Sequence, residues 1–248
     1  MKIIQENIGE FAQLTGYLHE PNGDMNNIEV YPAIIILPGG GFRFCSDREA
    51  EPVAMNYFAE GFQAFVLRYT TTGKKTDAVM EDPMKDVQDT LRLIGERKKD
   101  YRVADGKMAI LGFSGGGHLA AASATHGPLR PDALLLAYPG ILHSDLRALE
   151  CPDILEAVDD NTPPTFLFGT ANDKITPPRH PMAFAKALDD VGVGFELHIF
   201  REGVHGLSLA KPWTSGGDSN MVNMTVARWF SMSLDWLKAE FGEFPVEV

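Results

Sequence analysis

Ser114 stands in the stretch Gly-Phe-Ser-Gly-Gly, between an apolar run and a helix-like segment. Lys107–Leu111 before it is typical of a buried strand, and Gly117–Ala124 after it is typical of a helix start. Strand, G-x-S-x-G and helix form a nucleophile elbow, in which a sharp turn exposes the serine. The flanking residues must be small, because a Cβ there would strike the adjacent chain. Ser114 is therefore a predicted nucleophile; the alternative is a glycine-rich turn around a bystander serine.

Two residues with complementary chemistry follow two other apolar runs. Asp173 lies in the loop after Thr165–Gly169, and His205 lies in a glycine-flanked loop after Phe195–Phe200. An imidazole can take the proton of a serine hydroxyl, and a carboxylate can orient that imidazole and stabilise its charged form. The order Ser114, Asp173, His205 on three strand ends is more specific than the pentapeptide alone. The alternatives are an Asx turn at Asp173 and an exposed loop histidine at His205.

The remaining aspartates and histidines fit these roles less well. His198 lies within a predicted strand, and His118 lies on the helix after Ser114, where packing is expected more than catalysis. The others do not directly follow a clear strand: Asp145, Asp153, Asp159, Asp160, His19, His126, His143 and His180.

Glycines 39–41 follow the apolar run Pro32–Leu37. Their backbone N–H groups can turn inward and hold a carbonyl oxygen as it becomes negatively charged. We predict that Gly40 and Gly41 form an oxyanion hole with the N–H of Gly115; the alternative is a flexible turn. A phosphate-binding loop is disfavoured, because no Gly-Lys-Ser/Thr ending follows.

The order of elements predicts an α/β fold in one domain, residues 1–248. Apolar runs alternate with amphipathic segments, which is typical of a mostly parallel sheet with helices on both faces. Antiparallel edge strands are expected within residues 1–20. The predicted central strands are 32–37, 62–67, 108–111, 133–138, 165–169 and 195–200. The predicted helices are 48–59, 82–99 (Asp82 as N-cap and Pro83 at the first helical position), 182–191 and 222–241.

Composition excludes several function classes. The 248 residues carry a formal net charge of −12 and no basic stripe, which disfavours nucleic acids and anionic membranes as partners. No run approaches the roughly 18 apolar residues of a membrane span. Two cysteines, Cys45 and Cys151, predict neither a disulfide framework nor a metal site, so we expect a cytoplasmic protein without metal or cofactor. Ser114 with His205 and Asp173 would attack an acyl carbon and release an alcohol, so the expected partner is a small ester substrate; the oligomeric state is left open.

Taken together, these motifs resemble the α/β-hydrolase esterases. The resemblance is carried by Pro38–Phe42, Gly112–His118, Asp173 and Val204–Gly206, with support from Gly61–Tyr69. The chain is similar to the small acetyl-xylan-esterase-like and feruloyl-esterase-like (BD-FAE) carbohydrate esterases, which border the prolyl-oligopeptidase-like group. The resemblance implies an α/β-hydrolase fold with a mostly parallel sheet of about eight strands and a minimal cap.

The resemblance also implies hydrolysis of short acyl esters, such as acetyl groups on xylo-oligosaccharides, by a Ser-His-Asp acyl-enzyme mechanism. Pro38 stands where lipase-type motifs have a histidine. The short connection between Tyr138 and Thr165, with Phe42 and Phe113 beside the glycine loop and Ser114, is expected to limit the acyl group to acetyl or propionyl. The alternatives are a prolyl-oligopeptidase-like peptidase with the same triad and a catalytically silent binding module.

Overall fold

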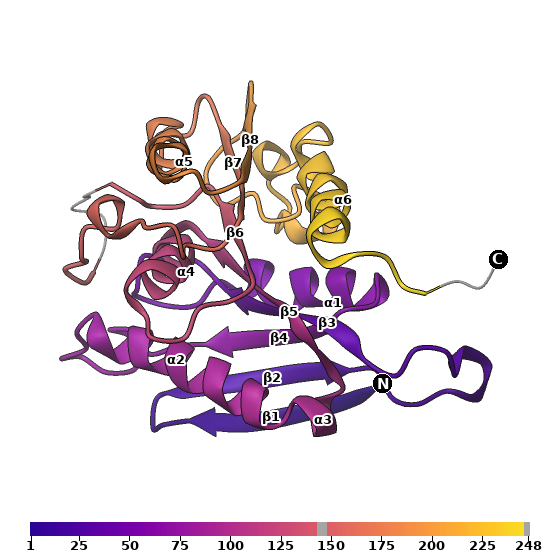
Figure 1. Ribbon diagram of the computed structural model, residues 1–248. Coiled ribbons are helices and arrows are strands. Elements are labelled where there is room, and N and C mark those ends of the chain that lie inside the picture. Colours follow the sequence, from indigo (N-terminus) through magenta and orange to yellow (C-terminus); the bar gives the residue numbers. More distant parts are fainter. Residues whose placement is uncertain (143–147, 246–248) are drawn as a thin grey trace.

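The computed structural model describes residues 1–142 and 148–245, and its centre is one twisted sheet of eight strands (Figure 1). Their order in space is β1-β2-β4-β3-β5-β6-β7-β8. The strands are β1 (Lys2–Ile8), β2 (Ala12–Leu18), β3 (Tyr31–Leu37), β4 (Gln63–Arg68), β5 (Val103–Phe113), β6 (Ala133–Ala137), β7 (Thr165–Thr170) and β8 (Phe195–Phe200). The predicted α/β fold class is confirmed.

The first two strands form a hairpin at one edge, and the other six are parallel. β1 pairs antiparallel with β2, and β2 pairs antiparallel with β4, as expected for residues 1–20. From β4 to β8 each pairing is parallel, with Ile36 beside Val66 on one side and Leu111 on the other. Parallel strands need both faces covered, which explains why these strands are continuous apolar runs.

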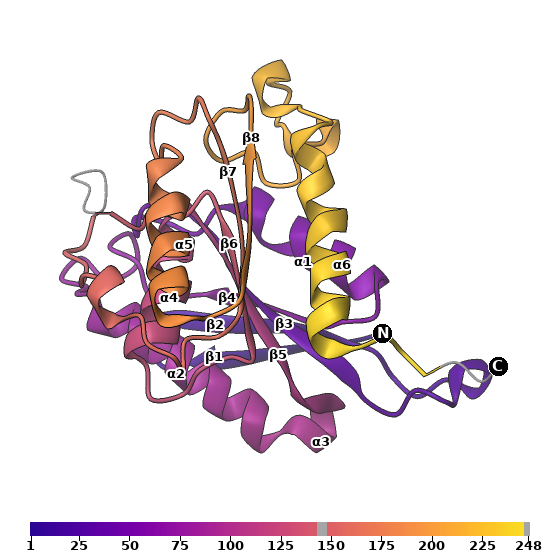
Figure 2. The ribbon, with the colours of Figure 1, turned by 45° about the horizontal axis from the view of Figure 1, so that its top comes forward.

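Helices cover both faces of the sheet (Figure 2). One buried cluster joins β-strand side chains to α2, α4 and α5, and a second joins the opposite face to α1 and α6. The largest fully buried side chain, Trp229, lies in the second cluster. The helices are α1 (Glu51–Ala59), α2 (Glu81–Glu96), α3 (Lys98–Tyr101), α4 (Ser114–His126), α5 (Arg179–Val191) and α6 (Trp229–Phe241).

Several predicted helix boundaries are wrong, including the starts of α1, which begins at Glu51, and of α5, which begins at Arg179. α2 begins at Glu81, so Asp82 lies in its first turn instead of capping it; the Asp82 carboxylate accepts from the Val79 amide and from Lys75. α2 also ends at Glu96, and a separate short helix, α3, follows. The predicted helix 222–241 begins only at Trp229, after two short 3-10 turns, η5 (Ser219–Met221) and η6 (Val226–Arg228).

The connection between β6 and β7 is short, as predicted. In its described part the only helical turn is η3 (Leu155–Ala157). The other 3-10 turns are η1 (Gly23–Met25), η2 (Asp47–Glu49) and η4 (Pro212–Thr214). Within residues 1–142 and 148–245, no helix has the length and apolar character needed to cross a bilayer.

Candidate active site

Ser114 lies at the sharp turn from β5 into α4. Its φ is +51°, a left-handed conformation that side chains rarely adopt. The flanking glycines are required by close approach: a Cβ on Gly112 would lie 2.3 Å from the Gly116 carbonyl oxygen, and one on Gly116 would lie 2.2 Å from the Leu37 carbonyl oxygen. The local sequence therefore forms the strained elbow that its glycines predict.

The side chains of Ser114, His205 and Asp173 form one continuous hydrogen-bonded chain. His205 Nε2 lies 2.7 Å from Ser114 Oγ, and His205 Nδ1 lies 2.7 Å from Asp173 Oδ2. Because a carboxylate can only accept, Nδ1 carries the proton and donates to Asp173. In the neutral ring Nε2 is then the acceptor for the Ser114 hydroxyl. The three residues chosen from the sequence are thus brought together in the order needed for proton transfer.

Asp173 is buried, with its side chain only 1% exposed. Oδ1 accepts from the amides of Ile175 and Thr176 at 2.8 and 3.0 Å, so the Asx-turn alternative is also present, made by the other carboxylate oxygen. Burial by itself would raise the pKa of Asp173, but the hydrogen bond and charge of His205 and the two amides together hold the pKa below its ordinary value. The carboxylate is therefore ionised and fixed in direction.

His205 lies in the loop after β8 and packs against the ring of Tyr138. The Tyr138 ring meets the imidazole edge-on, with ring centroids 5.2 Å apart. Thr176 Oγ1 lies 3.0 Å from Nδ1 and also 3.0 Å from the Tyr138 carbonyl oxygen. Tyr138 and Thr176 therefore hold the imidazole at its side and at Nδ1, and Nε2 is directed at Ser114.

The glycine loop after β3 has a backbone that only glycine accepts readily. Gly40 and Gly41 have φ of +132° and +58°, and a Cβ on Gly40 would lie 2.0 Å from the Phe44 carbonyl oxygen. The Gly41 nitrogen lies 3.1 Å from where a Cβ on Gly115 would be, so the loop and the start of α4 are in contact. Within the described residues, no hydrogen bond occupies the amides of Gly40, Gly41 or Gly115, which leaves them available to an oxygen atom.

Ser114 and His205 line a cavity of about 510 Å³. Gly40, Gly41 and Gly115 line it, so the predicted oxyanion residues reach the same space as the serine. Its apolar lining comes from Phe44, Ile175 and Met221, and its basic lining from Arg43 and Arg48. A cavity of this size suits a small organic molecule.

The expectation that Phe42 and Phe113 crowd the carbonyl is wrong. Both side chains are fully buried and neither lines the cavity. Phe42 packs toward Tyr69 and His118, and Phe113 packs against Trp229 on the other face of the sheet. Phe42 has φ of +65°, which turns it into the core, and the exposed Phe44 takes the place at the cavity.

Glu49 is a residue that sequence reasoning missed. It is the last residue of η2 and lines the cavity, yet it is only 3% exposed. Its Oε2 accepts from the Gly39 amide at 2.8 Å, and its Oε1 accepts from the Tyr138 hydroxyl at 2.6 Å. In the sequence it resembles any acidic residue in the first turn of a helix, so no signal distinguishes it.

Three of the other histidines and aspartates weighed for the triad have partners away from Ser114. His118 is buried with Nδ1 2.8 Å from the Gly140 carbonyl oxygen, and it does not line the cavity. His198 pairs with Glu196 on β8, and Asp159 pairs with Arg130. His143 and Asp145 lie outside the described residues. No group of three or more histidine, cysteine or acidic side chains in the described chain is arranged to hold a metal ion.

Two family models match successive parts of the chain. The BD-FAE model matches residues 19–130, and the prolyl oligopeptidase family model matches residues 146–243. The first region contains Ser114 and the glycine loop, and the second contains Asp173 and His205.

Two curated relatives are similar to this chain. Endo-1,4-beta-xylanase B of Butyrivibrio fibrisolvens is 30% identical over an alignment of 255 positions, which covers 89% of this chain and 39% of the relative. Acetylxylan esterase of Xylanibacter ruminicola is 26% identical over 200 residues, which cover 70% of this chain and 40% of the relative. The chain therefore spans about two fifths of the length of the curated relatives it matches.

Solved structures match over nearly the whole chain. MGS-M1, an α/β-hydrolase enzyme from a Medee basin deep-sea metagenome library, is 38% identical with a TM-score of 0.91, covering 98% of this chain and 99% of that one. The carboxylesterase Cest-2923 from Lactobacillus plantarum is 25% identical with a TM-score of 0.89, covering both chains fully. An acetyl ester-xyloside bifunctional hydrolase from Caldicellulosiruptor lactoaceticus is 30% identical with a TM-score of 0.79, covering 93% and 89%.

Proposed function

Because the chain belongs to the α/β-hydrolase family, we propose that it is a serine esterase that hydrolyses short-chain acyl esters, with Ser114, His205 and Asp173 as its catalytic triad. It is a carboxylic ester hydrolase, as the kinship to carboxylesterases and an acetylxylan esterase indicates. The observation that carries the proposed mechanism is the unbroken chain of hydrogen bonds from Asp173 through His205 to Ser114 at the cavity.

In the acylation step, His205 Nε2 takes the proton of Ser114 while Oγ attacks the acyl carbon of the ester. The carbonyl electron pair moves onto oxygen, and the free amides of Gly40 or Gly41 and of Gly115 donate hydrogen bonds to the oxyanion. The electron pair then returns, the C–O bond to the alcohol breaks, and the imidazolium gives its proton to the leaving alkoxide. The alcohol departs and the acyl group remains on Ser114.

In the deacylation step, water takes the place of the alcohol. His205 removes a proton from the water as it attacks the acyl carbon, and the same amides stabilise the second oxyanion. Collapse breaks the bond to Ser114, which recovers the proton from the imidazolium. Throughout, the ionised and buried Asp173 accepts the hydrogen bond from Nδ1–H and stabilises the imidazolium.

For the substrate, we propose acetyl esters of small molecules, with acetylated xylo-oligosaccharides as the first candidates. Support comes from the similarity to an acetylxylan esterase and to an acetyl ester-xyloside bifunctional hydrolase. The cavity of about 510 Å³ can hold a sugar residue beside a small acyl group. We further propose a cytoplasmic location, on the low cysteine content of the sequence.

A prolyl-oligopeptidase-like peptidase is the second candidate, favoured by the family match over residues 146–243. It would use the same triad, so the substrate decides between the two. Release of acetate from acetylated xylo-oligosaccharides and p-nitrophenyl acetate should be compared with cleavage of prolyl peptides. Faster peptide cleavage would replace the esterase proposal.

The triad is tested by substitution. Ser114→Ala and His205→Ala should each lower kcat for p-nitrophenyl acetate by at least about a thousandfold, because the residues act as a unit. Asp173→Asn should lose less, through a misoriented imidazole. A fluorophosphonate should label the wild type and not Ser114→Ala. Near wild-type turnover in Ser114→Ala would refute the assignment, and absence of both turnover and label in the wild type would favour a silent binding module.

A further inference from the structure

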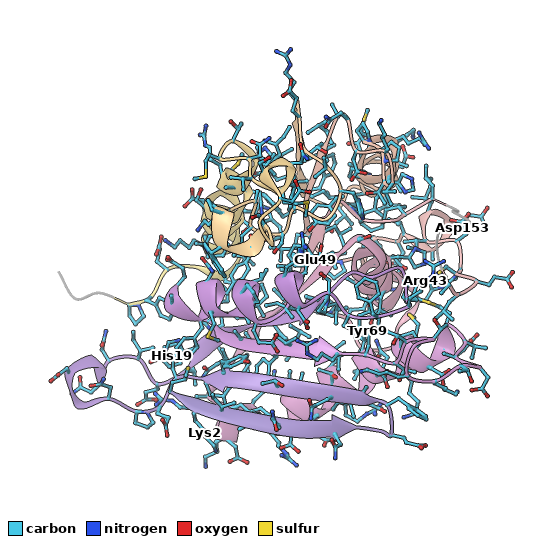
Figure 3. All side chains as sticks on the ribbon, turned by 180° about the vertical axis from the view of Figure 1, so that it is seen from behind. Lys2, His19, Arg43, Glu49, Tyr69 and Asp153 are labelled. Carbon is cyan, nitrogen blue, oxygen red and sulfur yellow. The ribbon has the colours of Figure 1, made fainter. Side chains whose placement is uncertain are left out.

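Glu49 is buried beneath the glycine loop, and both of its carboxylate oxygens are used. Oε2 accepts from Gly39 N–H at 2.8 Å and Oε1 accepts from the Tyr138 hydroxyl at 2.6 Å. Figure 3 shows it in the interior of the molecule, whereas Lys2 lies at the rim of the sheet. Within the described chain no cation forms an ion pair with Glu49. A buried carboxylate without a cation is costly, so its presence calls for an explanation.

The carboxylate, the glycine loop and the nucleophile pack directly against one another. A Cβ on Gly39 would lie 2.7 Å from Glu49 Oε2 and 3.0 Å from Ser114 Cβ. Gly39 therefore lies directly between Glu49 and Ser114, and its missing side chain lets them approach each other. The residue before it is also fixed, because the Tyr69 hydroxyl donates to the Pro38 carbonyl oxygen at 2.7 Å. Together these two bonds anchor the start of the loop that carries Gly40 and Gly41.

Tyr138 continues this network to the histidine loop. Its hydroxyl oxygen accepts from the Ser208 amide at 2.9 Å, so its single proton goes to Glu49. The Tyr138 ring lies edge-on to His205, and its backbone has a strained φ of +36°. Glu49 thus contacts both the glycine loop and the residue that supports the imidazole.

The charge of Glu49 does not help the oxyanion by electrostatics. Burial raises its pKa, although the bonds from Tyr138 and Gly39 oppose that shift. A negative charge just behind the oxyanion position would disfavour the developing negative charge. The charge also interacts with His205, where it would favour the imidazolium, so an effect on the oxyanion itself must come from where the carboxylate holds the backbone.

We propose that Glu49 is a positioning residue that fixes the oxyanion loop through Gly39 and couples it to the histidine loop through Tyr138. This inference rests on the proposed function, because the amides of Gly40 and Gly41 matter only if Ser114 forms an oxyanion. Misplacement of such donors by a fraction of an ångström costs rate in the transition state while leaving ground-state binding almost unchanged.

The test compares three glutamate variants by steady-state kinetics on p-nitrophenyl acetate. In Glu49→Gln, an NH2 group replaces one carboxylate oxygen and meets a donor, either the Gly39 amide or the Tyr138 hydroxyl, so one of the two bonds is lost. The value of kcat should then fall about ten- to a hundredfold, with KM within about twofold. Glu49→Asp retains the charge but is one methylene too short, so it should be similarly impaired. Glu51→Gln is the matched control: Glu51 pairs with Arg68 outside the cavity, and kcat should not change.

Affinity for a boronic acid that forms a tetrahedral adduct with Ser114 gives the second readout. It should fall by about the same factor as kcat in Glu49→Gln, since the adduct oxygen occupies the oxyanion position. If Glu49→Gln does not fold, Tyr138→Phe, which removes one donor and keeps the ring, should show a smaller loss with the same pattern.

Three results would overturn the proposal. They are unchanged kcat in both Glu49 variants, full rescue by Glu49→Asp, and a loss confined to a displaced acid limb of the pH profile, which would mean that Glu49 acts on His205 by charge alone. Failure of the proposed function is distinguishable, because it would appear as activity retained in Ser114→Ala.

Discussion

Asp173 shows how one side chain can serve both local structure and chemistry. One oxygen closes an Asx turn with the amides of Ile175 and Thr176, and the other faces His205. The sequence offered these as competing interpretations, but the two lone-pair-bearing oxygens allow both at once.

Stability near Asp173 should depend on pH. The pKa of Asp173 lies below its ordinary value of 3.8, so the folded state binds the proton more weakly than the unfolded state. Its contribution is therefore present above about pH 3.8 and is lost as pH falls through the lower folded pKa. We expect Asp173→Asn to be less stable than the wild type at pH 7, with a difference that shrinks below pH 3.8.

Urea unfolding at pH 7, 5 and 3 measures this dependence. A difference between wild type and Asp173→Asn that stays constant across the three pH values would contradict it. The surface variant Asp153→Asn is a control, because Asp153 only caps the amides of Leu155 and Glu156.

At the scale of elements, the glycine loop between β3 and η2 has the most demanding backbone. The glycines predicted a loop at the site, and Gly40 and Gly41 do line the cavity, but the sequence could not tell that the Gly39 amide donates to Glu49 while the amides of Gly40 and Gly41 stay free. That distinction depends on a contact across ten residues of chain, which no local pattern encodes.

Gly40→Ala should disable the loop. Its φ of +132° and a carbonyl oxygen 2.0 Å from the new Cβ force the backbone to move. Gly9→Ala is the matched control, because Gly9 also has a positive φ, +71°, but no atom within 4 Å of its Cβ. Gly9→Ala should cost about 1 kcal/mol with normal kcat, and Gly40→Ala should cost more and lower kcat at least about tenfold. Chemical denaturation and kinetics measure both; equal effects would contradict the assignment.

The short β6–β7 connection bears on acyl length. Its described part holds one 3-10 turn, η3, and little material for a long acyl tunnel. Each methylene that found a burial site would gain up to ~0.8 kcal/mol, whereas one left in water gains nothing. We expect kcat/KM to be highest for acetyl or propionyl esters and to fall by butyryl or hexanoyl. A series of p-nitrophenyl esters from acetate to octanoate measures this, and a maximum at hexanoate or beyond would mean a general carboxylesterase.

The ends of helices are where prediction from the local sequence fails. Asp82 and Pro83 look like an N-cap and a first helical residue, but the buried Met80 is the N-cap and the helix already begins at Glu81. Likewise, Val222 to Arg228 is apolar enough for a helix, yet Asn223 accepts from the amides of Thr225 and Val226 and holds the segment in short turns. Side-chain to backbone bonds of this kind compete with helix formation.

At the scale of the whole molecule, the sheet explains why so much of the site was predictable. Gly39, Ser114, Tyr138, Asp173 and His205 each follow a strand from β3 to β8, and parallel strands bring their carboxyl ends to one edge. A residue's place just after an apolar run was therefore informative. Glu49 precedes α1 and reaches the site from the side, so the same rule did not find it.

The single-domain prediction for residues 1–248 belongs to this scale as well. Both buried clusters draw residues from early and late parts of the chain, which couples them through the shared sheet. We expect one cooperative thermal transition, with coincident curves from far-ultraviolet circular dichroism and tryptophan fluorescence. Two separated transitions would divide the chain into independent units.

The left-handed backbone of Ser114 has a consequence for how such a protein changes under selection. A residue with a side chain at φ of +51° stores roughly 1–2 kcal/mol that glycine would release. A library of variants screened for thermal stability alone should therefore enrich glycine at position 114. The selected variants would be more stable than the wild type but catalytically inactive. Only a screen that also demands turnover keeps the serine, so durability and activity are opposed at this one position.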